Sequence, residues 1–143
     1  MIRSEAKNIL LKEFNTNFSS TTPVSYTNYS EFFYTTGVKT TKPTNDTWVR
    51  FLIENNFSSQ VSIGKEGLRN FNRLGLISYQ VFTPSNKGTY SGEIVCEEIN
   101  NIFEGKRISG VICETGTYQE IGITEDDLFQ MTGNIPWWYY EKK

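Results

Sequence analysis

Apolar residues recur at two different spacings along this chain, and each spacing predicts one kind of element. The helical spacing predicts two amphipathic helices, one over residues 2–16 and one that begins near residue 90. Thr89 or Ser91 can cap the second helix, and Gly105 suits the position just after its end. The apolar positions of the two helices are Ile2, Ala6, Ile9, Leu10 and Phe14, and Ile94, Val95, Ile99, Ile102 and Phe103.

Alternating apolar and polar residues predict the strands of a sheet. Residues 47–55 and 57–64 each alternate in this way, and the Asn-Asn pair at their junction tolerates the positive φ of a tight turn. These two segments are therefore predicted to form a β-hairpin, followed by a loop over 65–71. Further strands are predicted over 23–29, 73–83, 111–122 and 127–140, the last two joined by the acidic turn at 124–127.

The order of these elements indicates an α+β protein with a mainly antiparallel β-sheet and two helices packed on one face. A chain of 143 residues is long enough for one domain and too short for two. We therefore expect a single domain over 1–143. The core that joins the sheet to the second helix is predicted to contain Leu52, Ile77, Val81, Ile99 and Phe103.

Composition excludes several classes of function. A net charge of −2 argues against a protein whose main task is to grip nucleic acid. The chain has no run of apolar residues long enough to span a membrane, and its charged first segment does not resemble a signal peptide. Cys96 and Cys113 are expected to be free, partly buried thiols in a reducing cytosol.

The polar turn at 84–89, PSNKGT, is the segment that most invites a catalytic interpretation. A phosphate-binding loop needs a leading glycine and a lysine after its last glycine, whereas here Lys87 precedes the only glycine, Gly88. The chain also has no histidine, which removes Ser–His and Cys–His nucleophiles and histidine-bound zinc. The turn is therefore interpreted as a connector.

The paired carboxylates give no stronger signal. Glu97 and Glu98 are adjacent on a helix, so their side chains point about 100° apart and cannot share a substrate. Glu125, Asp126 and Asp127 form a polar turn without the pattern of a calcium-binding loop. We expect no enzyme activity, no cofactor and no metal.

Two runs of consecutive aromatic residues, at 32–34 and 137–140, are the remaining candidates for a site. In an extended chain successive rings point to opposite faces, so only some of them can reach the core of the domain. The others are expected to meet a protein partner, although stacking on sugars or single-stranded nucleic acid uses the same residues. With two nearby lysines, the candidate interface residues are Phe32, Phe33, Tyr34, Lys39, Lys42, Trp137, Trp138 and Tyr140.

Several segments occur in a recognisable order. A W-x-R strand contains Trp48 and Arg50, and a glycine-led strand over 75–84 ends in V-F-x-P. A Gly-Thr turn at 88–89 and a helix that ends in F-x-G at 103–105 follow. In this order and spacing the chain resembles the tail-terminator (tail-completion) proteins of long-tailed bacteriophages, over about residues 46–106. The stretch 30–46 and the acidic turn depart from the family pattern.

The resemblance implies an α+β subunit that assembles with copies of itself as a ring, usually a hexamer, on the last ring of the tail tube protein. Such a ring ends tail polymerisation and offers a surface to head-completion and neck proteins. Phage DNA passes through it without specific binding. The implied location is the tail–neck junction of the virion, and the host cytoplasm during assembly, with no membrane.

The long Thr-rich stretch 30–46 is expected to be an extended assembly loop that orders against a neighbouring subunit or the tail tube. Two alternatives to the tail terminator stay open. One is another neck or tail protein, such as a head–tail joining protein or a tube subunit. The other is a module that binds carbohydrate or single-stranded nucleic acid through exposed aromatic rings.

Overall fold

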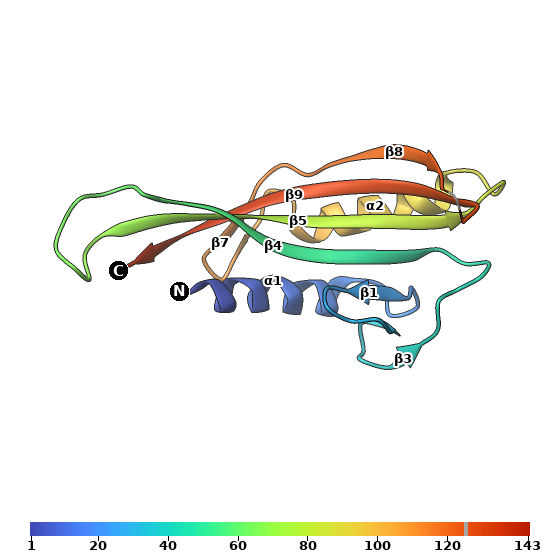
Figure 1. The fold of residues 1–143 in the computed structure, drawn as a ribbon, viewed down its shortest axis with the longest axis horizontal. Helices are drawn as coiled ribbons and strands as arrows, with labels where there is room; N and C mark the ends of the chain where they lie inside the picture. The colour runs from blue at the N-terminus through green and yellow to red at the C-terminus, as the bar shows by residue number, and fades with distance from the viewer. Residues whose placement is uncertain (125) are drawn as a thin grey trace.

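The computed structural model describes residues 1–124 and 126–143, and within them it contains two helices and nine strands (Figure 1). The helices are α1 (Arg3–Asn17) and α2 (Tyr90–Phe103). The strands are β1 (Val24–Tyr26), β2 (Phe32–Phe33), β3 (Lys39–Thr40), β4 (Trp48–Gln60), β5 (Asn70–Pro84), β6 (Arg107–Ile108), β7 (Val111–Cys113), β8 (Thr117–Ile123) and β9 (Leu128–Lys142).

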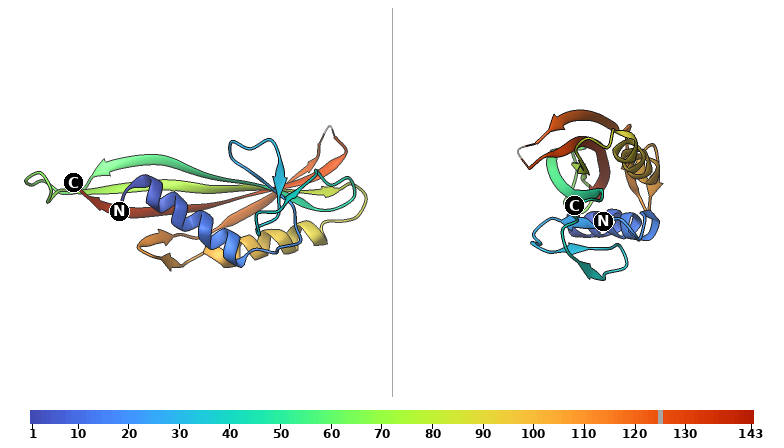
Figure 2. Two further views of the ribbon diagram at one scale, coloured as in Figure 1. Left: turned by 90° about the horizontal axis from the view of Figure 1, so that it is seen from below. Right: turned by 90° about the vertical axis from the view of Figure 1, so that its right-hand side faces the viewer.

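All of these strands belong to one sheet. Its order is β3-β2-β1-β4-β5-β9-β7-β6, and β8 pairs with β9 beside this path. The pairs are antiparallel except for β1 with β4, which is parallel. The three long strands β4, β5 and β9 form the body of the sheet, which is strongly curled, and α1 and α2 lie on the same side of it (Figure 2). The predicted α+β fold, with its helices on one face, is confirmed.

The register of the three long strands directs one face of the sheet toward the helices. Phe51 of β4 lies between helix residues Phe14 and Phe103, with ring centroids 3.9 Å and 6.2 Å away. Each fully buried side chain of this kind contributes about 1.5–3 kcal/mol of transfer free energy. The residues that β4, β5 and β9 contribute to this core are Val49, Phe51, Ile53, Ile77, Tyr79, Val81, Met131, Ile135, Trp137 and Tyr139.

Two glycines allow large rings to lie flat against the strands. A Cβ added to Gly75 would come within 2.1 Å of the Trp137 ring, and one added to Gly133 within 2.2 Å of the Tyr79 ring. Glycine inside a strand weakens it intrinsically, so its presence here marks a close approach. Trp137 and Tyr79 occupy the space that these glycines leave.

The second helix ends as predicted. Glu104 is its C-cap, and Gly105 follows with φ +70°, the left-handed conformation that glycine adopts without strain. Thr89 is the N-cap residue, but its side chain makes no capping hydrogen bond.

The hairpin predicted between 47–55 and 57–64 is wrong. β4 runs through both segments as one strand, with only a register shift between Asn55 and Phe57. The chain reverses later, in the loop over 61–69, where Gly67 has φ +87°. The two asparagines are accommodated by a bulge because β5 is long enough to pair with all of β4.

Two further predictions need correction. Leu52 is only half-buried, because it alternates with Phe51 and Ile53 and therefore lies on the opposite face of the sheet. The strand predicted over 111–122 is two strands, β7 and β8, which pair with different parts of β9. Within the acidic turn predicted at 124–127, Glu125 lies outside the described residues.

Candidate assembly surfaces

The stretch 30–46, hereafter the arm, is folded onto the sheet. β2 pairs with β1, and β3 pairs with β2, so the arm extends the sheet beyond β4. A reverse turn is closed by hydrogen bonds from Tyr34 N to Val38 O and from Gly37 N to Tyr34 O, both 2.9 Å. The expected extended loop is therefore a small β-structure within a single chain, and its contact with a neighbour stays a prediction.

The aromatic rings of the arm point to opposite sides, as predicted. Phe32 meets Trp48 edge-on at a centroid distance of 5.1 Å, whereas Phe33 packs near Tyr26 and Tyr29. Phe32, Phe33 and Tyr34 are all half-buried. Most of their contact area is thus used to hold the arm on its own subunit.

Trp48 is the centre of a second aromatic cluster, on the face of the sheet opposite the helices. It stacks on Phe82 at 4.3 Å, and the cations of Lys42 and Arg50 lie 5.3 Å and 5.9 Å from its ring. These distances are typical of cation–π contacts. The W-x-R and V-F-x-P segments therefore meet in the structure, and Trp48 also contacts Phe32 and Lys42 of the arm.

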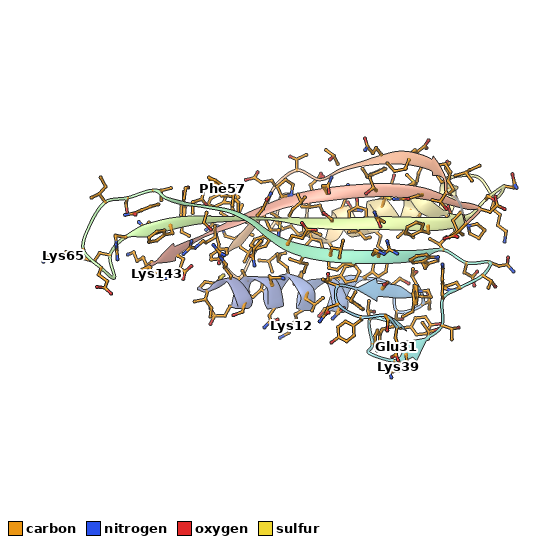
Figure 3. All side chains as sticks on the ribbon, viewed as in Figure 1. Lys12, Glu31, Lys39, Phe57, Lys65 and Lys143 are labelled. Atoms are coloured by element: carbon orange, nitrogen blue, oxygen red, sulfur yellow. The ribbon has the colours of Figure 1, made fainter. Side chains whose placement is uncertain are left out.

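The lysines of the arm differ in their surroundings. Lys39 forms an exposed ion pair with Glu31 at 2.9 Å, which Figure 3 shows at the outer margin of the arm. An exposed pair of this kind contributes about 0–1 kcal/mol. Lys42 is exposed but lies over Trp48, as described above. Lys87 of the polar turn reaches the same region and donates a hydrogen bond to Asn45 O at 3.4 Å.

The terminal aromatic run divides between the two faces of β9. Trp137 and Tyr139 are buried in the core. Trp137 is therefore not available to a partner, and the prediction that it is an interface residue is wrong. Trp138 and Tyr140 are on the opposite face, where their rings meet edge-on at 5.2 Å. Trp138 is half-buried and its indole N–H donates to the Glu114 carboxylate, and Tyr140 is 57% exposed.

A surface that the sequence reasoning missed lies at the distal end of the β4–β5 hairpin, the end that projects beyond the helices (Figure 1). Phe57 is 62% exposed and Ile63 is fully exposed. We define the hairpin surface by its apolar members Phe57, Val61, Ile63 and Leu68. Alternation predicts a strand over 57–64, but β4 ends at Gln60, so only Phe57 lies in the strand and the other three residues lie in the loop that follows.

Strand β8 is the second missed surface. It pairs with β9 along one edge, and its other edge has no strand partner among the described residues. Six of its seven residues are exposed. We define the β8 surface by its exposed apolar members Tyr118, Ile121 and Ile123. An exposed edge strand with apolar side chains is a template for association with another chain.

The two cysteines are free and buried. Burial raises the pKa of each thiol to about 12, and nearby glutamates add to the shift, Glu93 and Glu97 at Cys96 and Glu13 and Glu114 at Cys113. A neutral, inaccessible thiol is a poor nucleophile. Among the described residues no three histidine, cysteine, aspartate or glutamate side chains gather as metal ligands, and no described helix is long and apolar enough to cross a membrane.

An open groove of about 490 Å³ lies between α1 and the arm. Its wall includes Leu11, Tyr26, Phe33 and Phe51, with Asn15 at its margin. Asn15 accepts a hydrogen bond from the Tyr26 hydroxyl at 2.7 Å. The groove is mainly apolar, and several of its lining residues, such as Phe51, also pack in the core of the domain.

No protein-family model and no curated protein matches this chain. A solved structure known only by a serial designation is similar to it over 95% of this chain and 92% of that one, with a TM-score of 0.59 and 17% sequence identity. At this identity the similarity establishes a shared fold and carries no information about function.

Proposed function

We propose that this chain is a structural subunit of a tailed bacteriophage, a tail terminator that caps the tail tube as a ring of identical subunits. The observation that carries the proposal is the pair of exposed apolar surfaces, the hairpin surface and the β8 surface. Phe57 lies in β4, and the loop that carries the other members of the hairpin surface is held at its ends by hydrogen bonds from Val61 N to Asn70 O and from Lys143 N to Arg69 O. The β8 surface lies on a strand that pairs with β9. Ordered backbone that exposes apolar side chains to water is typical of surfaces that a partner covers.

The relative position of the two surfaces favours a ring. They lie toward opposite ends of an elongated subunit, as two views show (Figures 1 and 2). Contacts between unlike surfaces of successive copies generate closed rings when the rotation between copies closes. The resemblance over about residues 46–106 supports the tail terminator among proteins that form rings.

The mechanism is steric. A ring on the last ring of tail tube protein covers the surface that the next tube subunits would use, and it presents its own distal face to head-completion and neck proteins. Trp138 and Tyr140, on the sheet face away from the helices, are candidates for these contacts. In the arm, Val38 is exposed and Lys39 pairs only with its own Glu31 in the described structure.

The decisive experiment measures the size of the oligomer that the chain forms and its ability to stop elongation of tail tubes. Light scattering after size-exclusion chromatography should show a discrete oligomer for the chain alone or for the chain on tail tubes. Adding the chain to polymerising tube protein should stop elongation. Tubes that elongate unchanged in its presence would exclude the terminator, and co-polymerisation would instead support a tube subunit.

A test of the arm uses the deletion of residues 35–42, which removes β3 and the turn before it. The fold should persist, because the helices and β4, β5 and β9 make their contacts without this segment. Capping should weaken if the arm rests on a neighbour or on the tube. Normal capping by the folded deletion variant would show that the arm only covers Trp48.

A binding module for carbohydrate or single-stranded nucleic acid is the second candidate, and the groove between α1 and the arm is the observation that favours it. Tyr26, Tyr29 and Tyr34 line this groove. Fluorescence titration of the monomer with oligosaccharides and oligonucleotides distinguishes the two functions. A response that disappears in the Tyr29→Ala variant, in a chain that never oligomerises, would favour the binding module.

A further inference from the structure

The hairpin surface carries a concentration of positive charge. Lys65 and Arg69 lie in the loop between β4 and β5, and beside it Lys142 ends β9 and Lys143 follows. Arg69 Nε donates to Lys143 O at 3.2 Å, and Lys143 N donates to Arg69 O at 2.8 Å, so these residues are held together. Figure 3 shows Lys65 and Lys143 at the same end of the molecule. Glu66 is the one acidic residue within 61–69.

The β8 surface carries the opposite charge. Neither α2 nor β8 contains a lysine or an arginine, whereas α2 contains Glu93, Glu97 and Glu98 and β8 contains Glu120. Glu98 is occupied within the subunit, since it accepts a hydrogen bond from Ser19 N at 2.8 Å. Glu97 and Glu120 are exposed, and Glu93 is half-buried.

Tyr118 of β8 pairs with Gly133, and Gly133 pairs with Tyr79, whose hydroxyl donates a hydrogen bond to Asn100 of α2 at 2.8 Å, so β8 lies beside α2 and its glutamates. Partial desolvation raises the pKa of the Tyr118 hydroxyl, and the charges of Glu97 and Glu93 raise it further. Glu97 and Ile94 also line a shallow depression between α2 and the end of α1, together with Asn17 and Lys106. Carboxylates and exposed apolar side chains therefore share one surface.

We propose that the hairpin surface of one copy docks on the β8 surface of the next copy, apolar residues on apolar residues and the lysine–arginine cluster on the α2 glutamates. This inference rests on the proposed ring and names the surfaces that build it. Each surface is a poor partner for itself, because hairpin against hairpin would bring like cations together and β8 against β8 would bring carboxylates together. Opposite charge selects the unlike pairing, which propagates from copy to copy.

Charge reversal tests the pairing directly. One variant combines Lys65→Glu with Arg69→Glu, and a second combines Glu93→Lys with Glu97→Lys. Each alone should associate about tenfold more weakly or worse, because like charges then face one another. An equimolar mixture should recover association, since every contact in an alternating assembly again joins opposite charges. Analytical ultracentrifugation provides the readout, and circular dichroism checks that each variant is folded.

Lys12→Glu is the matched control. Lys12 is an exposed lysine of α1 outside both surfaces, as Figure 3 shows. It receives the same kind of charge reversal, at one position, and should leave association unchanged. Reversal variants that associate as the unmodified chain does would overturn the inference, and so would a mixture that fails to recover.

Cross-linking gives a second measurement that does not depend on charge. Leu68→Cys and Tyr118→Cys place single exposed thiols on the two surfaces, while the native cysteines stay buried. A short bis-maleimide should join the two variants to each other and neither variant to itself. Self-linked pairs, or no links in a chain that assembles and caps tubes, would reject this interface and leave the proposed function standing. A chain that stays monomeric at all concentrations and on tubes would reject the interface, and the elongation assay would then decide the function separately.

Discussion

The two halves of β4 pair with the same neighbour but differ in what covers them. In the first half Val49, Phe51 and Ile53 face the helices and are buried. In the second half the register shift after Asn55 turns Phe57 to the face away from the helices, where it is 62% exposed. β5 pairs with both halves. Backbone pairing therefore orders the whole strand, whereas burial of its side chains depends on a second layer. Apolar residues on the ordered but uncovered half are the ones available for assembly.

The strongest test of this comparison is the loss of a large ring from each half of the molecule. Phe103 is fully buried and packs against Phe51 in the covered half. Phe103→Ala should lower the free energy of unfolding by about 3–5 kcal/mol. Phe57→Ala, the matched change in the uncovered half, should alter it by only about 0.5 kcal/mol. Urea denaturation followed by tryptophan fluorescence measures both, and a loss below about 1 kcal/mol for Phe103→Ala would contradict the packing.

A glycine at the boundary sharpens the comparison. Gly75 pairs with Asn55, and an added Cβ would lie 2.1 Å from the Trp137 ring and 2.4 Å from Glu54 O. Gly75→Ala should therefore cost about 1–3 kcal/mol through overpacking. Gly64→Ala in the hairpin loop is the control, because the nearest atom to its Cβ would be 3.9 Å away. Equal stability of the two variants in urea would show that Trp137 moves aside freely.

The buried thiols predict a pH dependence for the covered region. The pKa of Cys96 and of Cys113 rises from 9.0 to about 12 on folding. Between pH 9 and about pH 12 the unfolded chain has lost thiol protons that the folded chain keeps, so the free energy of unfolding falls as pH rises through this window. Below pH 9 the thiols are protonated in both states and their full contribution to stability is present. Denaturation at about pH 8 and about pH 10.5 should show a smaller loss in a Cys96→Ala/Cys113→Ala variant. Equal losses would mean that the tyrosines alone cause the decline.

The smallest effect is expected at the hairpin tip. Val61→Ser combined with Ile63→Ser removes two exposed apolar side chains and should change the free energy of unfolding by no more than about 0.5 kcal/mol. A thermal melt would detect a larger change. A destabilisation above about 1 kcal/mol would mean that the tip packs on its own subunit, contrary to the comparison between the two halves of β4.

Periodicity was sufficient to predict the elements that pack. The spacing of Leu10 and Phe14, the alternation of buried Ile77 and Tyr79 with Ser78, and Gly105 at a helix end all reflect local rules that the fold obeys. Local rules failed at Asn55 and Asn56, where pairing with a long partner strand outweighed turn chemistry. The position of a turn depends on the partner, which is distant in sequence.

The candidate surfaces were harder to predict for the same reason. Alternation correctly separates Trp137 from Trp138, but it does not tell which of the two faces the helices. It likewise predicts Phe57 on one face of a strand without showing that the register shift after Asn55 turns this side chain away from the helices. Whether an apolar residue of a strand is exposed depends on which elements cover that face of the sheet, and this is known only from the three-dimensional structure.

The position of β9 has a consequence for biosynthesis. Among the described strands it is the last in chain order, yet it lies inside the sheet, paired with β5 along one edge and with β7 and β8 along the other. During translation β5 would emerge with one edge open and would stay so while more than forty further residues were made, since β9 begins at Leu128. Sheets that depend on such distant pairings fold slowly. A nascent chain stalled before residue 128 should therefore be protease-sensitive and should recruit chaperones, and release of the complete chain should end both behaviours.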